Sequence, residues 1–194
     1  IPGYSHATIA PTGMITDTEG MTIPVNGATY YAVFAEGEGG GSQDHTITLT
    51  ADNLNLTSNN GYQEAESTIN GFDFLVDKGY KGSVNSKSVI QMKYEEGQNA
   101  GLLYNQDAIP NLKSITVNVA KGDNFFEIYE DDSFDANDYG TLLAEPTGTT
   151  TQNFSSGSQY FTISVYGVVY FSSIIITYTE NEGSSYSNYT TSCS

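Results

Sequence analysis

Tryptophan and arginine are absent from this chain of 194 residues, which also contains one cysteine and two histidines. Cys193 cannot form a disulfide within the chain, and together with His6 and His45 it is too little for a four-ligand zinc site. In an oxidising environment Cys193 could bridge two chains; otherwise it is incidental. Both histidines fall in arm or loop regions, so no Ser-His-Asp arrangement can be argued. The sequence therefore predicts a protein that is not an enzyme.

Positive charge is also scarce, because six lysines face 23 acidic residues and the net charge is −17. Such a charge repels phosphate backbones and anionic lipid headgroups. We therefore expect no nucleic acid partner and no membrane insertion. The acidity fits solubility in an extracellular setting, and the alternative interpretation is cation binding.

Long apolar runs are missing except at residues 160–178, YFTISVYGVVYFSSIIITY. Four tyrosines and several serines and threonines make this run too polar for a membrane span. Its residues alternate between apolar and polar with a period of two, which is typical of half-buried strands. We predict a paired core hairpin turning at Gly167. The side chains expected in the core are Phe161, Ile163, Val165, Ile174 and Ile176.

Short alternating segments separated by polar turns fill the rest of the chain, and none has helical spacing. We expect residues 68–76 to form one strand with a bulge at Gly71, and residues 78–87 to form a polar loop. Residues 124–130 should pair with the preceding strand across a turn at 121–123, and a long Thr-rich connection should lead to residue 160. The predicted strands are Thr29–Ala35, Thr46–Thr50, Thr68–Val76, Ser88–Tyr94, Leu102–Asn105, Leu112–Ala120 and Asn124–Glu130, besides the two in the hairpin.

These segments predict an all-β fold, an antiparallel β-sandwich or jelly roll over residues 29–180. Residues 1–28 contain prolines and irregularly spaced apolar residues, so we expect an extended N-terminal arm. Residues 181–194 are polar and should form a flexible tail. A start at Ile1 fits a processed chain, a trimmed one or a domain of a longer protein.

The order of TITLT, INGFDF, SVIQMK, LLYN, IPNLKSITV, FEIYEDDS and the closing apolar run resembles C-terminal β-sandwich modules of secreted and surface proteins. Those proteins come from Gram-positive bacteria and mollicutes, and their modules look like relatives of discoidin or galactose-binding-like jelly rolls. The resemblance implies this fold and attachment to carbohydrate or to a surface. The missing tryptophan departs from lectin-like relatives, which use such rings to stack on sugars.

The acidic loop at residues 130–140, EDDSFDANDYG, is a candidate Ca²⁺ site. Carboxylate and amide oxygens are the ligands that Ca²⁺ prefers, but the EF-hand pattern fails because its twelfth position is Pro146. An ordinary solvated loop is the alternative, and this composition favours it. The candidate ligands are Asp132, Asp135, Asn137 and Asp138.

Tyrosine is abundant, with 15 residues, and several of them fall beside loops and strand ends. Tyrosines beside Asn and Asp suit a glycan or a protein partner, although most tyrosines at strand edges only bury their rings and keep the hydroxyl wet. The candidate contacts are Tyr62, Tyr80 and Tyr104. Three N-x-S/T sequons, at Asn55, Asn153 and Asn188, are compatible with glycosylation.

Two functions follow from these observations. The first is an exterior structural or assembly protein: a virion decoration or fibre protein, or a subunit of a surface filament. Its arm would add as a strand to an exposed sheet edge of its own chain or a neighbour's, with Ile9, Met14, Ile15 and Ile23 filling pockets. The alternative is a carbohydrate-binding module of a secreted or cell-surface protein. Either function places the chain outside the cell or on a virion exterior.

Overall fold

The structure, a computed structural model, describes residues 43–180 except residues 60, 95–99, 123, 134 and 136–137. These residues lie within one compact unit, Gly41–Glu182. The predicted arm, the predicted strand Thr29–Ala35 and the tail lie outside the described residues. The described part contains strands and no helix, so it has no helix that could cross a membrane.

Eleven strands make up the described part of the chain, and every pairing between them is antiparallel. They are β1 (Gln43–Leu49), β2 (Gln63–Ile69), β3 (Phe72–Val84), β4 (Lys87–Lys93), β5 (Gly101–Asn105), β6 (Leu112–Lys121), β7 (Phe126–Asp131), β8 (Thr141–Ala144), β9 (Thr150–Asn153), β10 (Tyr160–Val165) and β11 (Val168–Glu180).

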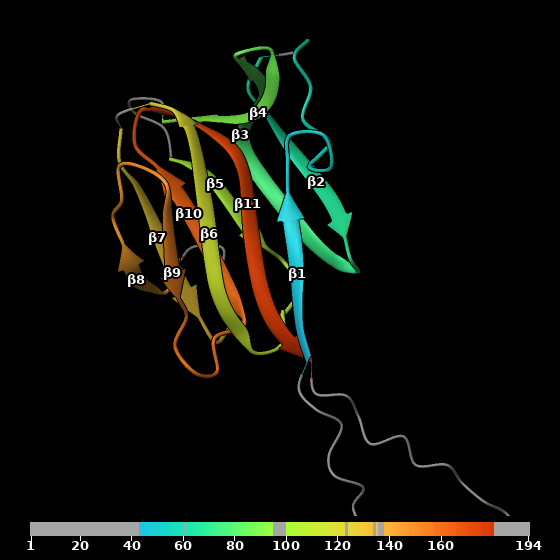
Figure 1. Cartoon of the computed structure of the whole chain (residues 1–194), viewed down its shortest axis with the longest axis vertical. Coiled ribbons are helices and arrows are strands. Elements are labelled where there is room, and N and C mark those ends of the chain that lie inside the picture. The colour runs from blue at the N-terminus through green and yellow to red at the C-terminus, as the bar shows by residue number, and fades with distance from the viewer. Residues whose placement is uncertain are drawn as a thin grey trace, which may run out of the picture. The chain divides into compact units, whose positions relative to one another are not determined.

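The strands form two layers of a β-sandwich (Figure 1). Layer I consists of β9, β6 and β11, with β1 and β4 both pairing along the other side of β11. Layer II consists of β8, β7, β10, β5, β3 and β2. The two layers are continuous because β4 also pairs with the second half of β3. The predicted all-β antiparallel sandwich is therefore confirmed.

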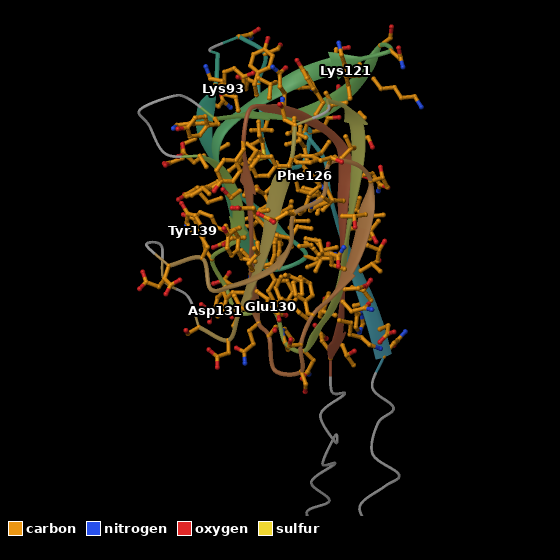
Figure 2. The ribbon with its side chains drawn as sticks, turned by 90° about the vertical axis from the view of Figure 1, so that its left-hand side faces the viewer. Lys93, Lys121, Phe126, Glu130, Asp131 and Tyr139 are labelled. Atoms are coloured by element: carbon orange, nitrogen blue, oxygen red, sulfur yellow. The ribbon has the colours of Figure 1, made fainter. Side chains whose placement is uncertain are left out.

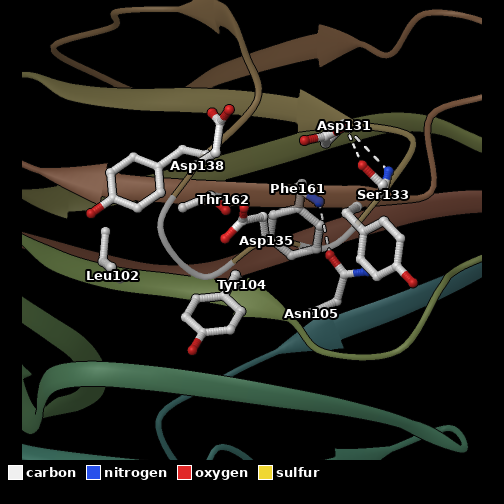
Figure 3. Close-up of a pocket in the computed structure, with 11 residues that line it drawn as sticks. Leu102, Tyr104, Asn105, Asp131, Ser133, Asp135, Asp138, Phe161 and Thr162 are labelled. Carbon is white, nitrogen blue, oxygen red and sulfur yellow. Dashed lines mark hydrogen bonds between the residues drawn. The ribbon is translucent and has the colours of Figure 1, made fainter.

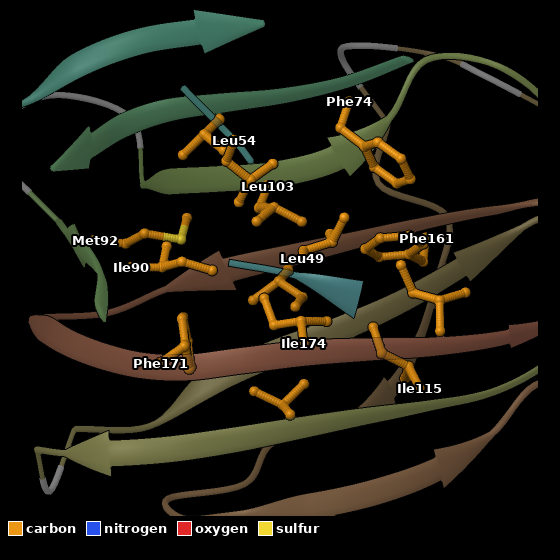
Figure 4. Close-up of a cluster of buried hydrophobic side chains, with 14 of the residues drawn as sticks. Leu49, Leu54, Phe74, Ile90, Met92, Leu103, Ile115, Phe161, Phe171 and Ile174 are labelled. Carbon is orange, nitrogen blue, oxygen red and sulfur yellow. The ribbon is translucent and has the colours of Figure 1, made fainter. Parts of the chain in front are cut away.

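The core lies between the two layers and consists of their inward-pointing side chains (Figure 4). All five predicted core residues are buried: Phe161, Ile163, Val165, Ile174 and Ile176 are at most 1% exposed. Aromatic rings also join the layers, because Phe126 of β7 meets Phe171 of β11 edge to face at 5.1 Å. Alternating burial along each strand is the direct result of the period-two pattern.

The predicted pairing within residues 160–178 is wrong. The chain does turn at Gly167, where φ is +92°, but β10 pairs with β5 and β7 while β11 pairs with β4, β6 and β1. The two strands belong to different layers and face each other across the core. Two apolar strand faces can meet in this way as readily as they can lie side by side, and the alternation is the same in both cases.

The predicted single strand at residues 68–76 is also wrong, because it contains a hairpin turn. Asn70 and Gly71 both have positive φ, at 53° and 85°, which is the requirement of a two-residue type I′ turn. The strand after this turn then runs on to Val84, through most of the segment predicted as a polar loop. A second pair with positive φ, Asn85 and Ser86, turns the chain into β4.

Two further expectations are corrected. The strands on either side of residues 121–123 do not pair with each other, because β6 pairs with β11 and β9 while β7 pairs with β10 and β8. The Thr-rich connection contains β8 and β9, and β2 starts before the predicted strand. These short strands lie at edges, where one side is solvated and an apolar alternation is not required.

Replacing Ile174 with Ala should destabilise the sandwich by about 2–5 kcal/mol, because the side chain is fully buried and its loss leaves a cavity. Urea unfolding measures this change. Ile175→Ala is the matched control on the same strand: its side chain points away from the core and is partly exposed, so its cost should stay below about 1 kcal/mol. Equal costs at the two positions would contradict the orientation of β11.

Candidate functional site

The outer face of layer II carries an array of tyrosines, which we call the tyrosine face. Inward residues Ile128, Ile163 and Leu103 align across β7, β10 and β5 and enter the core. The residues next to them in sequence must point outward, because successive side chains of a strand alternate. The outward residues are Glu127 and Tyr129 of β7, Tyr160, Thr162 and Ser164 of β10, Leu102 and Tyr104 of β5, and Leu75 and Asp77 of β3.

One row crosses the centre of this face, from Tyr129 to Thr162 to Tyr104 to Leu75. The adjacent row along the strands runs from Glu127 through Ser164 and Leu102 to Asp77. Thr162 and Ser164 of β10 have short side chains and lie between tyrosine-bearing strands. Ser164 is fully buried, and Glu127 and Leu102 beside it are less than 10% exposed, so this row is covered by its neighbours.

A stack of three aromatic rings lies where β10 ends. The Tyr166 ring is 4.8 Å from Phe125, at an interplanar angle of 13°, and 6.1 Å from Tyr94, at 23°. Phe125 and Tyr94 are 40% and 39% exposed, unusually high for large apolar rings of this protein. From Tyr160 to Tyr166 the face is about 20 Å long, at about 3.3 Å per residue.

Glu127 is a buried carboxylate among these rings. The Tyr129 hydroxyl donates a hydrogen bond of 2.5 Å to Glu127 Oε2. Tyr139 meets the Tyr129 ring edge to face at 5.5 Å. These contacts hold the carboxylate and the two phenol groups in one fixed arrangement.

The tyrosine hydroxyls of this face stay protonated. Burial, followed by the hydrogen bond to Glu127, raises the pKa of both Tyr129 and Tyr166. Burial and the nearby charges of Asp77 and Glu127 raise the pKa of Tyr139, and burial and Glu64 raise the pKa of Tyr104. Each phenol therefore remains a neutral group that can donate or accept a hydrogen bond.

A small hollow of about 20 Å³ lies at the other end of the face (Figure 3). Figure 3 shows Asp135 among Thr162, Phe161 and Tyr104. Leu102, Tyr139, Tyr160 and Asp138 also line it. The hollow combines ring surface with carboxylate oxygens, and its volume is that of about one water molecule.

Two buried polar side chains position the wall of this hollow. Asn105 is fully buried: its Oδ1 accepts from the Phe161 backbone N–H at 2.8 Å, and its Nδ2 donates to the carbonyls of Asp107 and Gln159. Glu130 accepts from the Ser155 N–H and hydroxyl at 2.7 and 2.6 Å and from the Ser158 hydroxyl at 3.0 Å. These bonds tie β5, β7 and the 154–159 segment together, so the hollow has a rigid base.

The predicted tyrosine contacts separate in the structure. Tyr104 lies on the tyrosine face and lines the hollow. Tyr62 and Tyr80 lie together elsewhere, with ring centroids 5.7 Å apart, over the second half of β3 and β4. The predicted arm residues Ile9, Met14, Ile15 and Ile23 lie outside the described residues.

The predicted Ca²⁺ ligands Asp132, Asp135 and Asp138 are all exposed, and Asn137 lies outside the described residues. Asp135 and Asp138 form an isolated β-bridge, and both line the hollow. Among the residues that the structure describes, no group of three or more His, Cys, Asp or Glu side chains could hold a metal ion. Calcium binding by this loop therefore stays a prediction.

The sequence analysis missed most of the tyrosine face, namely Tyr129, Tyr139, Tyr160, Tyr166, Phe125 and Glu127. One signal was present for Glu127, Tyr129 and Tyr160, which occupy outward positions of alternating strands, where Ser or Thr is expected; Phe125, Tyr139 and Tyr166 lie outside the strands and gave no such signal. The order of the strands in the sheet could not be predicted from the sequence, because it depends on pairings between segments that lie far apart in the chain.

Comparison with known proteins gives no match to a protein family and no match to a curated protein. Solved structures with a similar arrangement of strands include the K3 cleaved adhesin domain of Lys-gingipain from Porphyromonas gingivalis W83. It is 15% identical, with a TM-score of 0.38, and the match covers 68% of this chain and 91% of that one.

Two others are a family two carbohydrate esterase from Cellvibrio japonicus and the C-terminal CBM6 of LamC, a marine laminarinase from Zobellia galactanivorans. The esterase is 12% identical, with a TM-score of 0.39, and the match covers 73% of this chain and 36% of that one. The CBM6 is 14% identical, with a TM-score of 0.32, and the match covers 69% and 99%. Because these TM-scores lie below 0.5, the similarities carry no inference about what this chain binds, and they do not support the resemblance to modules of Gram-positive bacteria and mollicutes in particular.

Replacing Glu130 with Gln should lower stability at pH 7 by about 1–3 kcal/mol, because three donors lose a charged acceptor. Burial opposes the charge, but the bonds from Ser155 and Ser158 outweigh it and hold the pKa of Glu130 below its ordinary value of 4.5. This stabilisation is present above pH 4.5 and is lost as the pH falls through the lowered pKa.

The gap in urea midpoint between wild type and Glu130→Gln should therefore narrow from pH 7 to pH 3. Asp132→Asn is the control, since its side chain is exposed and should change the midpoint little at either pH. A gap that is the same at both pH values would show that the charge of Glu130 does not stabilise the fold.

Calcium at millimolar concentration should raise the melting temperature if the acidic loop binds it, because a ligand that binds only the folded state stabilises that state. Asp135→Ala should then abolish the rise. Scanning calorimetry with calcium and with chelator measures the effect, and identical curves would favour the solvated loop.

Proposed function

We propose that this chain is a carbohydrate-binding module of a secreted or cell-surface protein and that the tyrosine face is its binding surface. The observation that carries the proposal is the set of rings along one sheet face, with Tyr160 and Tyr104 at the hollow, Tyr129 and Tyr139 in contact, and a stack around Tyr166. The buried Glu127 carboxylate and neutral phenol groups lie among these rings.

A glycan matches this chemistry better than a protein or a lipid does. Sugar rings present flat C–H surfaces, which pack on aromatic rings, and a rim of hydroxyls, which donate to carboxylates and phenols. Half-buried tyrosines expose their rings and polar tips together, so they can serve both parts of a sugar. The exposed Phe125 and Tyr94 offer apolar surface that a folded chain does not usually leave in water.

The charge on the face selects for neutral sugars. Glu127 and Asp77 lie in one row, and Asp131, Asp135 and Asp138 line the hollow. These carboxylates accept bonds from hydroxyls and repel the carboxylate or sulfate groups of acidic sugars. We therefore infer that the ligand is a neutral oligosaccharide or polysaccharide.

We propose binding without catalysis. Glycoside hydrolysis needs two carboxyl groups roughly 5 to 9.5 Å apart on either side of the scissile bond. On the tyrosine face, Glu127 and Asp77 stand three strands apart, so their backbone positions are about 14 Å apart. Glu127 is also engaged by the Tyr129 hydroxyl.

The assembly role that the sequence suggests depends on residues 1–28, which lie outside the described residues. The assembly role therefore stays an expectation, and no contact within the described part of the sandwich supports it. A carbohydrate-binding module placed outside the cell accounts for the described surface with fewer assumptions.

Removing two rings of the face should weaken glycan binding by about tenfold or more, because a buried aromatic contact contributes about 1–2 kcal/mol. The variant is Tyr104→Ala with Tyr166→Ala, and affinity electrophoresis in gels containing neutral β-glucan, mannan or xylan measures binding. The matched control is Tyr80→Ala, which removes the same ring away from the face and should bind as wild type does.

Retardation of wild type by none of these polymers, or equal retardation of wild type and the double variant, would contradict the proposal. Incubation of wild type with a retarding polymer should release no reducing ends. Release of reducing ends would show instead that the face is catalytic.

A further inference from the structure

The outer face of layer I differs from the tyrosine face because its two central rows carry no charge. One row runs from Thr48 through Ile175 and Thr116 to Thr151, across β1, β11, β6 and β9. The next row consists of Thr46, Thr177, Ser114 and Asn153 in the same order. In a chain with a net charge of −17, these rows form a neutral, hydroxyl-rich surface.

A cluster of tyrosine and lysine side chains lies at the end of this face toward the β3–β4 hairpin. Tyr80, Gln91, Tyr170 and Lys121 form one row across β3, β4, β11 and β6. The inward neighbours Ile90, Met92, Val169 and Phe171 belong to the core, so this row points outward. We call these four residues, together with Tyr62 and Lys93, the lysine platform.

Side-chain contacts hold the platform together. The Lys93 ammonium lies 4.2 Å from the centroid of the Tyr62 ring, and the Lys121 ammonium lies 5.9 Å from the Tyr170 ring. The Gln91 amide donates to the Tyr62 hydroxyl, and the Tyr80 hydroxyl donates to the Ser58 carbonyl at 3.0 Å. The Tyr62 and Tyr80 hydroxyls are therefore held by hydrogen bonds, and the Tyr62 and Tyr170 rings each have an ammonium group at one face.

Positive charge is concentrated at this end of the sandwich. Five of the six lysines belong to β3, β4 or the last position of β6, namely Lys78, Lys81, Lys87, Lys93 and Lys121. Figure 2 shows Lys93 and Lys121 at the end of the sandwich opposite Glu130 and Asp131. Lys81 is paired with Asp52 at 2.5 Å. The Lys93 and Lys121 ammonium groups also lie over the Tyr62 and Tyr170 rings.

We propose that the lysine platform is a second binding site, which takes an anionic polysaccharide bearing carboxylate or sulfate groups. From the strand spacing and register, Lys93 and Lys121 stand roughly 12 Å apart at the backbone, with the Tyr62 and Tyr170 rings nearby. The two ammonium groups pair with two acidic groups of one chain, and the rings support the sugars between them. The neutral rows of Thr and Ser continue the surface beyond the lysine platform, and they do not repel an acidic polysaccharide.

The net negative charge of the chain disfavours binding of a nucleic acid to the lysine platform. Duplex DNA carries one charge per about 1.7 Å, and a chain with 23 acidic residues and no arginine repels so dense a polyanion. A polysaccharide with separated acidic groups has a lower charge density than a nucleic acid, so two ammonium groups can neutralise it locally even though Glu95, Glu96 and Asp123 lie close in sequence to Lys93 and Lys121. This site does not depend on the tyrosine face being a glycan site.

The test uses the full chain with dextran sulfate and polygalacturonate as probes and neutral dextran for comparison. Binding is measured by calorimetry at 50 and 200 mM salt. Wild type should bind at least one of the acidic polymers, more weakly at the higher salt, and should bind dextran at least tenfold more weakly. Lys93→Gln with Lys121→Gln should weaken acidic binding at least tenfold.

Lys113→Gln is the matched control, because it also removes one lysine of layer I but lies at the other end, paired with Asp44. It should bind within twofold of wild type, as should the variant Tyr104→Ala with Tyr166→Ala, so failure of this site is distinguishable from failure of the tyrosine face. Melting temperatures confirm that each variant is folded.

Three results would overturn the proposal. They are no binding of either acidic polymer, equal binding by wild type and the double lysine variant, and equal or tighter binding of a single-stranded oligonucleotide of the same total charge. The last result would show a site that responds to charge density alone.

Discussion

The burial of alternate side chains between β10 and β11 is the constraint on which the rest of this structure depends. Phe161, Ile163 and Val165 enter the core from layer II, and Phe171, Ile174 and Ile176 enter it from layer I. A shift of either strand by one residue would expose its whole apolar set, so the register is strongly specified. Every other strand except β2 is then placed by pairing with one of these two strands or with a partner of theirs, and β2 pairs with β3.

The same alternation determines both outer surfaces. Once Ile163 points inward, Thr162 and Ser164 must point outward, and their partners on β5 and β7 bring Tyr104, Tyr129 and Glu127 beside them. Once Ile174 and Ile176 point inward, Ile175 and Thr177 lie outside beside Thr116 and Ser114. The tyrosine face and the uncharged outer rows of layer I therefore both follow from the side-chain alternation that builds the core.

Much of the fold could be predicted from the sequence, because strands and their buried faces depend on local alternation. The core residues of 160–178 are an example. Pairing could not be predicted, since the alternation of β10 and β11 is the same whether they share a sheet or face each other. The Asn70–Gly71 turn was available as a hairpin signal, but two flanking apolar segments made one strand equally consistent. For the site, Tyr104 was predicted as a contact, and Asp135 and Asp138, predicted as Ca²⁺ ligands, line the hollow. The other residues were missed, because a face assembled from four strands has no signature within any one of them.

The net charge of the chain says little about what each surface binds, because the fold places acidic and basic residues on different surfaces. Carboxylates gather on layer II and at the acidic loop, whereas four lysines lie on β3 and β4 and a fifth lies at the end of β6. A ligand responds to the charges within about a Debye length and hardly at all to the total. A chain with a net charge of −17 can therefore carry one surface rich in carboxylates and another rich in ammonium groups, and the two proposed sites differ in the charge of the sugars they would accept.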